Sequence, residues 1–384
     1  MAIVFTKNPA VQNIQNAFNN VIVEFNSNAP VTYSKCEIEV TYLSDVYDFV
    51  ITPIDRNFYF NLKQIASKIA KKNNFKDELT NISLGLNTYD LFFLLSVKYT
   101  IVFDAGGTET STQNYNFYKS VMQINNPLPS IFNTTNVLDI VNYADLTMFK
   151  GFPFDFSIYT QSDVTIKNDF LQTEEVLTKV DSSNRLFLSN GLDFLGSFGG
   201  RVNSISGGFM VNNNCANVSK SDLVKVGANV LKLSEATSET ILNLDVKDSC
   251  GVYLRYFNNY GNYSYWLFED VSNTDLKVQT KGTVNVDFED INETYTTELT
   301  TGKLAQKFVN LRSKNLDKNK RKQLESLFTS PRIDLYLGKK GEAVNDYSEK
   351  WETVILQDGT FTQGSSKREL SNISVTIRKK HYTI

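Results

Sequence analysis

Histidine and cysteine are scarce in this chain of 384 residues, which has one histidine and three cysteines. The lone histidine, His381, lies near the end of the sequence, so a Ser-His-Asp triad or a Cys-His pair lacks a well-placed base. Cys36, Cys215 and Cys250 are far apart and do not have the spacing of zinc ligands. We therefore expect no metal, no cofactor and no enzymatic activity, and we expect buried, reduced thiols in a protein assembled in a reducing cytosol.

A strong charge excess is also missing, because 39 basic residues face 42 acidic ones. A nucleic-acid-binding chain would carry a basic excess, and the local cluster Lys314 to Lys322 is better explained as the solvated face of a short helix. No apolar run approaches the roughly 20 residues of a membrane helix, and the N-terminus lacks the pattern of a signal peptide. We expect neither nucleic acid nor membrane as a partner.

Aromatic residues are abundant, with 27 Phe and 19 Tyr, while Pro numbers only 7. Short alternating runs such as 21–25, 36–42 and 97–103 are separated by turn residues, which favours strands. The pattern predicts a mainly β, multi-domain β-sandwich architecture with a few short helices. The helices are expected at 62–70, with Asn61 as the N-cap, and at about 317–328, capped by Asp317 or Asn319.

Three domains are expected from the breaks in this pattern. Asn125 to Pro129 combines two asparagines with two prolines and predicts the first boundary. The domains are then an N-terminal β-sandwich (1–125), a central β domain (126–300) and a C-terminal helix-plus-β domain (301–384). A further hairpin is expected around the turn Gln357-Asp358-Gly359.

Two patterns raise the question of catalysis. Asp104-Ala105-Gly106-Gly107-Thr108 is similar to a phosphate loop of actin-like and sugar-kinase ATPases, but that fold needs a second such loop and an α/β alternation. A glycine turn at a strand end is therefore expected. The paired carboxylates Glu174-Glu175 and Glu269-Asp270 would suit glycoside hydrolysis, although adjacent acids are also typical of solvated surfaces.

The segment Cys250 to Phe268, CGVYLRYFNNYGNYSYWLF, is the most informative part of the chain. Two aromatic runs flank an Asn- and Gly-containing connection, which predicts a β-hairpin. We expect one face of this hairpin to lie in a domain core and the other close to an intermolecular contact, because Tyr, Trp and Arg dominate binding hot spots. The interface candidates are Tyr253, Arg255, Phe257, Tyr263, Tyr265 and Trp266.

This hairpin, with Leu324 to Pro331 and Trp351 to Leu356, resembles virion proteins of tailed phages that infect Bacteroidota, including the crAss-like phages. In that group a Tyr-Leu-Arg strand, an Asn/Gly turn and a Tyr-Trp-hydrophobic-Phe strand recur in this order. The chain departs from it at Asn262-Tyr263-Ser264, where a Gly-Trp pair is frequent.

The resemblance implies a structural protein of the virion tail or neck that is assembled in the host cytoplasm. Such a protein would assemble with itself as a cyclic ring, portal-proximal or tail-hub, and would contact other phage tail and neck proteins. Loops such as 191–217 are candidates for adding strands to neighbours. The alternatives are a tail-tip adhesin that binds host surface glycans through Tyr265 and Trp266, and a polysaccharide hydrolase that uses the paired carboxylates.

Overall fold

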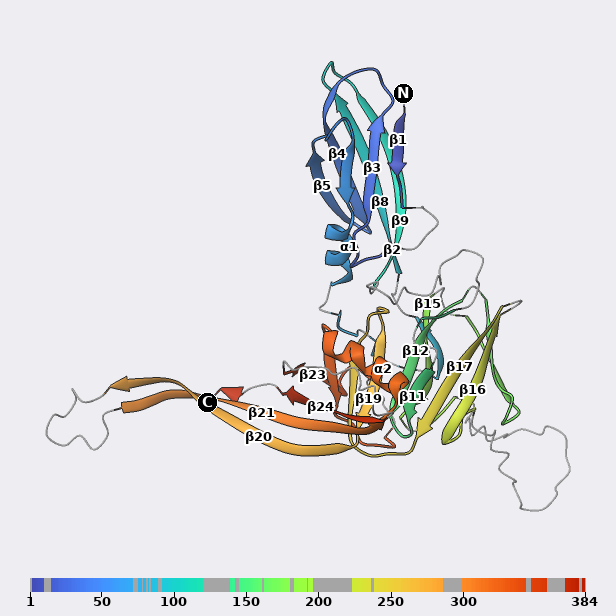
Figure 1. Cartoon of the computed structure of the whole chain (residues 1–384), viewed down its shortest axis with the longest axis vertical. Coiled ribbons are helices and arrows are strands. Elements are labelled where there is room, and N and C mark those ends of the chain that lie inside the picture. Colours follow the sequence, from blue (N-terminus) through green and yellow to red (C-terminus); the bar gives the residue numbers. More distant parts are fainter. Residues whose placement is uncertain are drawn as a thin grey trace, which may run out of the picture.

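The computed structural model describes residues 2–9, 15–71, 75–77, 79–80, 82, 84–88, 92–119, 139–141, 145–160, 162–179, 183–191, 193–195, 223–235, 238–285, 298–342, 347–357, 370–379 and 382–383. Within these residues the chain is mainly β, with several sheet domains and two short helices, as the sequence predicts. Figure 1 shows an N-terminal sandwich, a second body at its lower end, and a long two-stranded ribbon that projects from that body.

The N-terminal sandwich packs a three-stranded sheet against a five-stranded sheet, with helix α1 (Lys63–Ala70) at one end. The alternation of buried and exposed residues along its strands places one apolar face of each sheet in a shared core. The first sheet has the order β1 (Ile3–Lys7), β3 (Ile22–Ser27), β6 (Phe58–Asn61). The second has the order β2 (Gln15–Asn16), β9 (Thr108–Tyr118), β8 (Phe92–Phe103), β4 (Tyr33–Tyr42), β5 (Asp45–Ile51).

The second body contains two smaller sheets and part of an eight-stranded one. The smaller sheets have the orders β10 (Asp139–Val141), β12 (Pro153–Tyr159), β15 (Ser183–Asn190), β7 (Gly85–Thr88) and β11 (Asp145–Phe149), β17 (Ser238–Lys247), β16 (Gly227–Glu235), β13 (Val164–Asn168), β14 (Thr173–Leu177). The large sheet runs β19 (Tyr263–Phe268), β18 (Val252–Phe257), β22 (Ile333–Tyr336), β23 (Trp351–Leu356), β24 (Ser371–Arg378), β21 (Glu298–Leu316), β20 (Asp270–Asn285), with β25 (Tyr382–Thr383) on β21.

The expected three-domain division differs from the structure in two places. Residue 300 lies inside β21, and one hydrophobic core extends from Leu86 to Ile377, so the central and C-terminal regions form one body. Strand β7 pairs with β15, so residues 85–88 belong to this second body although they lie within 1–125. Long-range pairing joins segments that are distant in the sequence, and local composition does not report it. The expected boundary at residues 125–129 and the turn at Asp358-Gly359 lie outside the described residues.

Both expected helices form. Helix α2 (Lys318–Thr329) begins after Asp317, whose side chain accepts a hydrogen bond from the Lys320 backbone N–H at 2.8 Å. Asn61 is not the N-cap of α1, because Leu62 occupies that position. Its side-chain oxygen nevertheless accepts from the Lys63 backbone N–H at 3.1 Å, so it satisfies one of the free donors of the first turn.

The turn of the β18–β19 hairpin lies against the end of the N-terminal sandwich. Gly261 has a φ of +83°, and a Cβ at this position would lie 2.4 Å from the Lys119 carbonyl oxygen. Gly106 in the β8–β9 turn has a similar φ of +90°, but a Cβ there would meet no atom within 4 Å. Substitution of Gly106 therefore tests the cost of the left-handed backbone alone, and substitution of Gly261 tests that cost together with a steric clash.

We predict that Gly261→Ala lowers the free energy of unfolding by about 2–5 kcal/mol, because it adds a clash to the left-handed penalty. Gly106→Ala is the control and is expected to cost about 1–2 kcal/mol, which is the backbone term alone. Denaturant unfolding of both variants measures the difference. Equal losses would contradict the close approach of this turn to Lys119.

Candidate functional site

The hairpin predicted from the sequence is confirmed as β18 and β19. Its register places Arg255 opposite Tyr265 and Phe257 opposite Tyr263. Asn258 organises the turn, because its side-chain oxygen accepts from the Tyr260 backbone N–H at 2.8 Å while its own N–H donates to the Asn262 carbonyl at 2.7 Å. The Asn and Gly residues of the motif therefore serve the turn geometry.

The expectation that one face of this hairpin lies close to an intermolecular contact is contradicted by its burial. All residues of β19 and all but the first of β18 are buried, so both faces of the hairpin pack within the chain. Strands β11 and β12 lie on β19, and helix α2 lies on β18. The six interface candidates are therefore core residues, with exposed fractions of 1% to 6%: Tyr253, Arg255, Phe257, Tyr263, Tyr265 and Trp266. Alternation along a strand tells which residues share a face, but it does not tell whether another layer covers that face.

A buried ionic cluster has Asp77 at its centre and includes Arg255 of the hairpin. One oxygen of Asp77 accepts from Arg185 Nη1 at 2.7 Å and from Arg255 Nη1 at 2.8 Å. Asp155 holds Arg185 through two bonds, 2.6 Å from Nε and 2.9 Å from Nη2. Asp334 accepts from Arg255 Nε at 3.0 Å. We call these five residues the ionic cluster; each side chain is at most 2% exposed.

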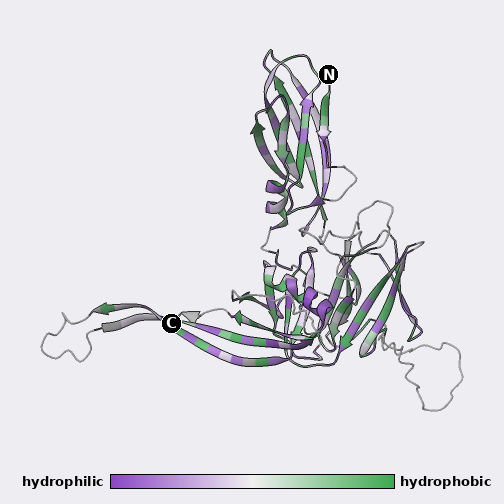
Figure 2. Cartoon of the chain, viewed as in Figure 1, coloured by the Kyte–Doolittle hydropathy of each residue, from purple (hydrophilic) through white to green (hydrophobic). Residues whose placement is uncertain are grey.

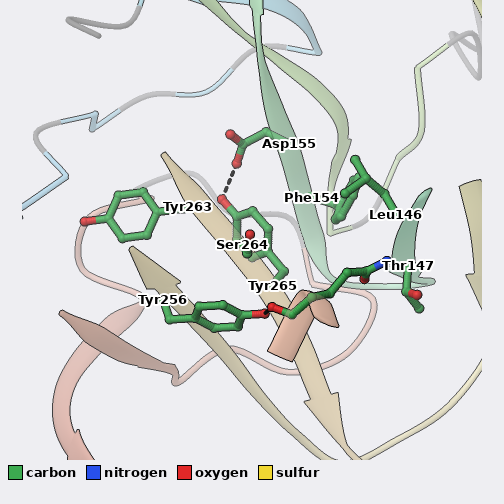
Figure 3. Close-up of a pocket in the computed structure, with 9 residues that line it drawn as sticks. Leu146, Thr147, Phe154, Asp155, Tyr256, Tyr263, Ser264 and Tyr265 are labelled. Atoms are coloured by element: carbon green, nitrogen blue, oxygen red, sulfur yellow. Dashed lines mark hydrogen bonds between the residues drawn. The ribbon is translucent and has the colours of Figure 1, made fainter. Parts of the chain in front are cut away.

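Aromatic rings enclose the ionic cluster. The guanidinium carbon of Arg255 lies 4.3 Å from the ring centre of Trp351 and 4.6 Å from that of Tyr263, which is cation–π geometry. The Tyr265 hydroxyl donates to Asp155 (Figure 3). It also lies 2.8 Å from the Tyr347 hydroxyl. These rings exclude water while their hydroxyls satisfy the charges, so the buried ions keep hydrogen-bond partners.

The cluster perturbs the pKa values of its members. Burial would raise the pKa of Asp77, but the Arg185 and Arg255 guanidinium groups outweigh burial and hold the pKa below its ordinary value. Burial, followed by the Asp155 charge, raises the pKa of Tyr265 well above its ordinary value. Burial also raises the pKa of Tyr347 to about 12, although the two arginines oppose it. The aspartate is therefore ionised and the tyrosines neutral at neutral pH.

Asp77 also connects the two bodies. It lies in the segment that follows α1, and the ring of the neighbouring Phe75 lies between Phe18 of the sandwich (centroids 6.0 Å apart) and Phe257 of the hairpin (4.7 Å). Phe75 has a φ of +56°, an uncommon conformation for a bulky residue that the surroundings must hold in place. The Tyr263 hydroxyl donates to the Phe75 carbonyl oxygen. The ionic cluster thus anchors the connection between the sandwich and the second body.

The cavity beside the cluster is too small for an organic ligand. It is lined by residues including Phe154, Asp155, Tyr256 and Tyr265, shown in Figure 3, and its volume is about 10 Å³. This is close to the space that one water molecule needs. The three carboxylates of the cluster are already paired with arginines, and no group of three or more His, Cys, Asp or Glu in the described part of the chain is arranged to hold a metal ion. The arrangement is suited to holding segments together.

The paired carboxylates lie on strand ends and edges. Glu174 and Glu175 lie in edge strand β14, opposite Lys167 and Ile166 of β13. Asp270 lies at the start of β20, where a hydrogen bond from Lys314 holds its pKa below the ordinary value. A general acid needs a raised pKa, so Asp270 does not have the property that the hydrolase hypothesis requires of an acid.

Other residues singled out from the sequence have structural positions. Asp104 to Thr108 form the turn between β8 and β9, with Gly106 and Gly107 at positive φ, as expected for a glycine turn. Cys36 is buried as expected, but Cys250 is exposed, which corrects the expectation for that thiol. Cys215, His381 and most of the loop 191–217 lie outside the described residues. No helix among the described residues is long and apolar enough to cross a membrane.

Sequence reasoning identified Arg255 but missed its partners. Asp155 is flanked by Phe154 and Phe156, and Asp334 by Ile333 and Leu335. A single charge between large apolar residues in a strand is the signal that was available, because such a charge points into a core only when it is paired. Asp77 has no such flanks, and nothing local distinguishes it.

Comparison with protein-family models gave no match, and comparison with curated proteins gave none either. Among solved structures, the chain is similar to a bacterial ice-binding adhesin (11% identity, 64% of this chain and 65% of that chain, TM-score 0.21) and to domains 4–9 of surface layer protein SbsC (10% identity, 98% and 42%, TM-score 0.20). It is also similar to a run of titin domains (9% identity, 81% and 93%, TM-score 0.21). The chain thus spans less than two thirds of the first two, and such scores carry no argument about function.

We predict that Asp77→Asn lowers the free energy of unfolding by about 3–5 kcal/mol, because it leaves two buried guanidinium groups short of a counter-charge. The control is Asp248→Asn, which removes an exposed partner of Lys340. That variant is expected to unfold at the same denaturant concentration as the parent chain. A stable Asp77→Asn protein would show that Asp155 and Asp334 suffice to neutralise the cluster.

The burial of Tyr253, Tyr265 and Tyr347 predicts that the folded chain loses stability at alkaline pH. Their folded pKa values lie above the unfolded value of about 10, so their contribution is complete below about pH 10 and is lost as the pH rises above it. Each such group adds a slope of about 1.4 kcal/mol per pH unit. Tyr265→Phe is expected to reduce the slope by about that amount. The control is Tyr59→Phe, which removes the hydroxyl of a tyrosine that is 44% exposed.

Denaturant midpoints measured between about pH 8 and pH 12, together with tyrosinate absorbance, check this prediction. Stability that is constant across this range would contradict the burial of these hydroxyls.

Proposed function

We propose that this chain is a structural subunit of a tailed-phage virion, and that copies of it assemble into a closed ring in the tail or neck. The observation that carries the proposal is the ribbon formed by β20 and β21. It projects far beyond the second body (Figure 1), and every side chain described in β20 from Asn273 to Lys281 is exposed. Among the described residues of β21, only the end from Val309 to Leu316 contributes to the core of the second body, and the rest of the ribbon supplies contact surface for a neighbour.

The composition of the ribbon supports an assembly role. Val271, Leu276, Val278 and Val284 of β20 are exposed by 44% to 62%. Figure 2 shows hydrophobic and hydrophilic residues alternating along both strands. Apolar side chains in exposed strands favour association with another protein, and regular alternation suits pairing with a further strand.

The resemblance to virion proteins supports the proposal through the residues that carry it. Its best motif, the β18–β19 hairpin, holds Arg255 and Tyr265 of the ionic cluster and its aromatic shell. Because these residues are buried, the motif is needed to maintain the fold. A shared fold is what we expect among structural subunits of one family. The surface that motivated the glycan-binding alternative is absent, because Tyr265 and Trp266 are 4% and 1% exposed.

The proposal predicts a ring of fixed copy number. Light scattering and electron microscopy of the purified chain are expected to show one closed oligomer, and mass spectrometry of purified phage particles is expected to detect the chain in stoichiometric amounts. A chain that is monomeric and also missing from the particles would refute the proposal.

A further inference from the structure

Residues 75–88 lie between two elements of the sandwich but pack on the second body. Helix α1 ends at Ala70, and β8, the next strand of the sandwich, begins at Phe92. Among the described residues, the sandwich core contains none between Ala70 and Phe93. The sandwich therefore closes its core without residues 75–88, which we call the docking segment.

The docking segment contributes apolar side chains to the second body. Leu86 is part of the core of that body. The ring of Phe75 lies 4.7 Å from the ring of Phe257 in the hairpin, measured between centroids. Three further apolar residues of the segment pack against the same core: Leu79, Ile82 and Leu84. Release of the segment would return this apolar surface to water, so the hydrophobic effect favours the docked state.

The docking segment also adds a strand to the second body. Its residues 85–88 form β7, which pairs antiparallel with β15. Among the described strands, this is the only pair that joins the first 119 residues to the rest of the chain. The Tyr347 backbone N–H donates to the Thr80 carbonyl oxygen at 2.8 Å. Addition of a strand to a sheet edge is a common mode of peptide recognition, in which main-chain hydrogen bonds supply affinity.

The charges of the second body match an acidic residue in the docking segment. Asp77 supplies the carboxylate that bridges two guanidinium groups, at 2.7 Å and 2.8 Å. Without Asp77, three arginines of the second body share two aspartates at this place: Arg185, Arg255 and Arg332 with Asp155 and Asp334. The second body thus has a surplus positive charge where Asp77 enters, and the two surfaces are complementary in charge.

We propose that the docking segment is a peptide ligand carried by the sandwich, and that the second body is the receptor that binds it. This binding, and not the covalent link through residues 120–138, holds the two bodies together. The receptor recognises an extended peptide with an aromatic residue, an aspartate two positions later, apolar residues and a short strand. The sandwich and the ribbon project from the second body in different directions (Figure 1), so the docked segment fixes the angle between them. Docking takes place within one chain and is independent of the proposed virion role.

Cleavage of the covalent link tests the proposal in the folded, full-length chain. A protease site inserted between Asn126 and Pro127 is cut after folding, which gives an affinity-tagged piece with residues 1–126 and a second piece with residues 127–384. We expect the tagged piece to retain the second piece through dilution and washing, because cleavage leaves every contact of the docking segment in place. Separation of the two pieces of the parent chain would overturn the proposal.

Substitutions in the docking segment test its contacts one at a time. Asp77→Asn removes the counter-charge, and Leu86→Asp places a charge in the core of the second body. Each is expected to raise the dissociation constant of the cleaved pieces at least about 30-fold. The matched controls make the same changes on the exposed surface of the sandwich, Asp48→Asn and Leu43→Asp, and are expected to bind like the parent. Circular dichroism of each tagged piece verifies that the sandwich folds, since none of these residues belongs to its core. Equal dissociation constants for test and control variants contradict the docking.

A competing peptide makes the test independent of the stability of these variants. The cleaved parent chain is incubated with an excess of a synthetic peptide of residues 71–91, and release of the second piece from the tagged piece is measured. We expect the parent peptide to release it, and the Asp77→Asn peptide to need at least about a 30-fold higher concentration for the same release. Release by neither peptide, or equal release by both, would show that the docking segment is not the ligand.

Discussion

The ionic cluster of Asp77, Asp155, Arg185, Arg255 and Asp334 is the interaction on which the rest of the structure depends. Its members come from the connection after α1, from two strands of the four-stranded sheet and from two strands of the eight-stranded sheet. A buried ion pair stabilises little by itself, because desolvation offsets most of the attraction. The cluster instead favours the native arrangement over other arrangements, because any arrangement that separates these segments leaves a buried charge without a partner.

That constraint explains how two bodies of unlike architecture are joined. The sandwich has its own core, and the second body has another that extends from Leu86 to Ile377. Between them the chain passes through Phe75, held between rings from both sides, and then through Asp77, held between two arginines. The aromatic contacts of Phe75 and the directional hydrogen bonds of Asp77 act together, and this combination defines how the connection enters the second body.

The ribbon of β20 and β21 differs from the core in its exposure to solvent. The side chains of the core are buried and paired within the chain, whereas the ribbon leaves apolar side chains and one strand edge in contact with solvent. A compact body with an exposed apolar ribbon is typical of a subunit that has its lowest free energy when it is assembled with other subunits. The aromatic hairpin first considered as a contact surface is part of the rigid body, and the less aromatic ribbon is the surface available for a neighbour.

Local patterns predicted a large part of this fold. The hairpin at 252–268, the α2 cap at Asp317 and the glycine turn at Asp104 to Thr108 depend on residues close together in the sequence, so their chemistry is legible there. The length of the ribbon and the burial of both hairpin faces were not predicted, and neither were the partners of Arg255. The alternation of β18 is the same whether a face meets water or another layer, and β11, β12 and α2, which cover the hairpin, come from distant segments.

The sequence by itself determined the mainly β class, the strand and turn chemistry and the scarcity of histidine and cysteine. Only the tertiary structure decided which residues are surface and which are core. Asp77 and Arg255 are separated by 178 positions and their side chains lie 2.8 Å apart. Such a contact is stabilised only when packing removes the water around both groups, and that removal is a property of the whole fold.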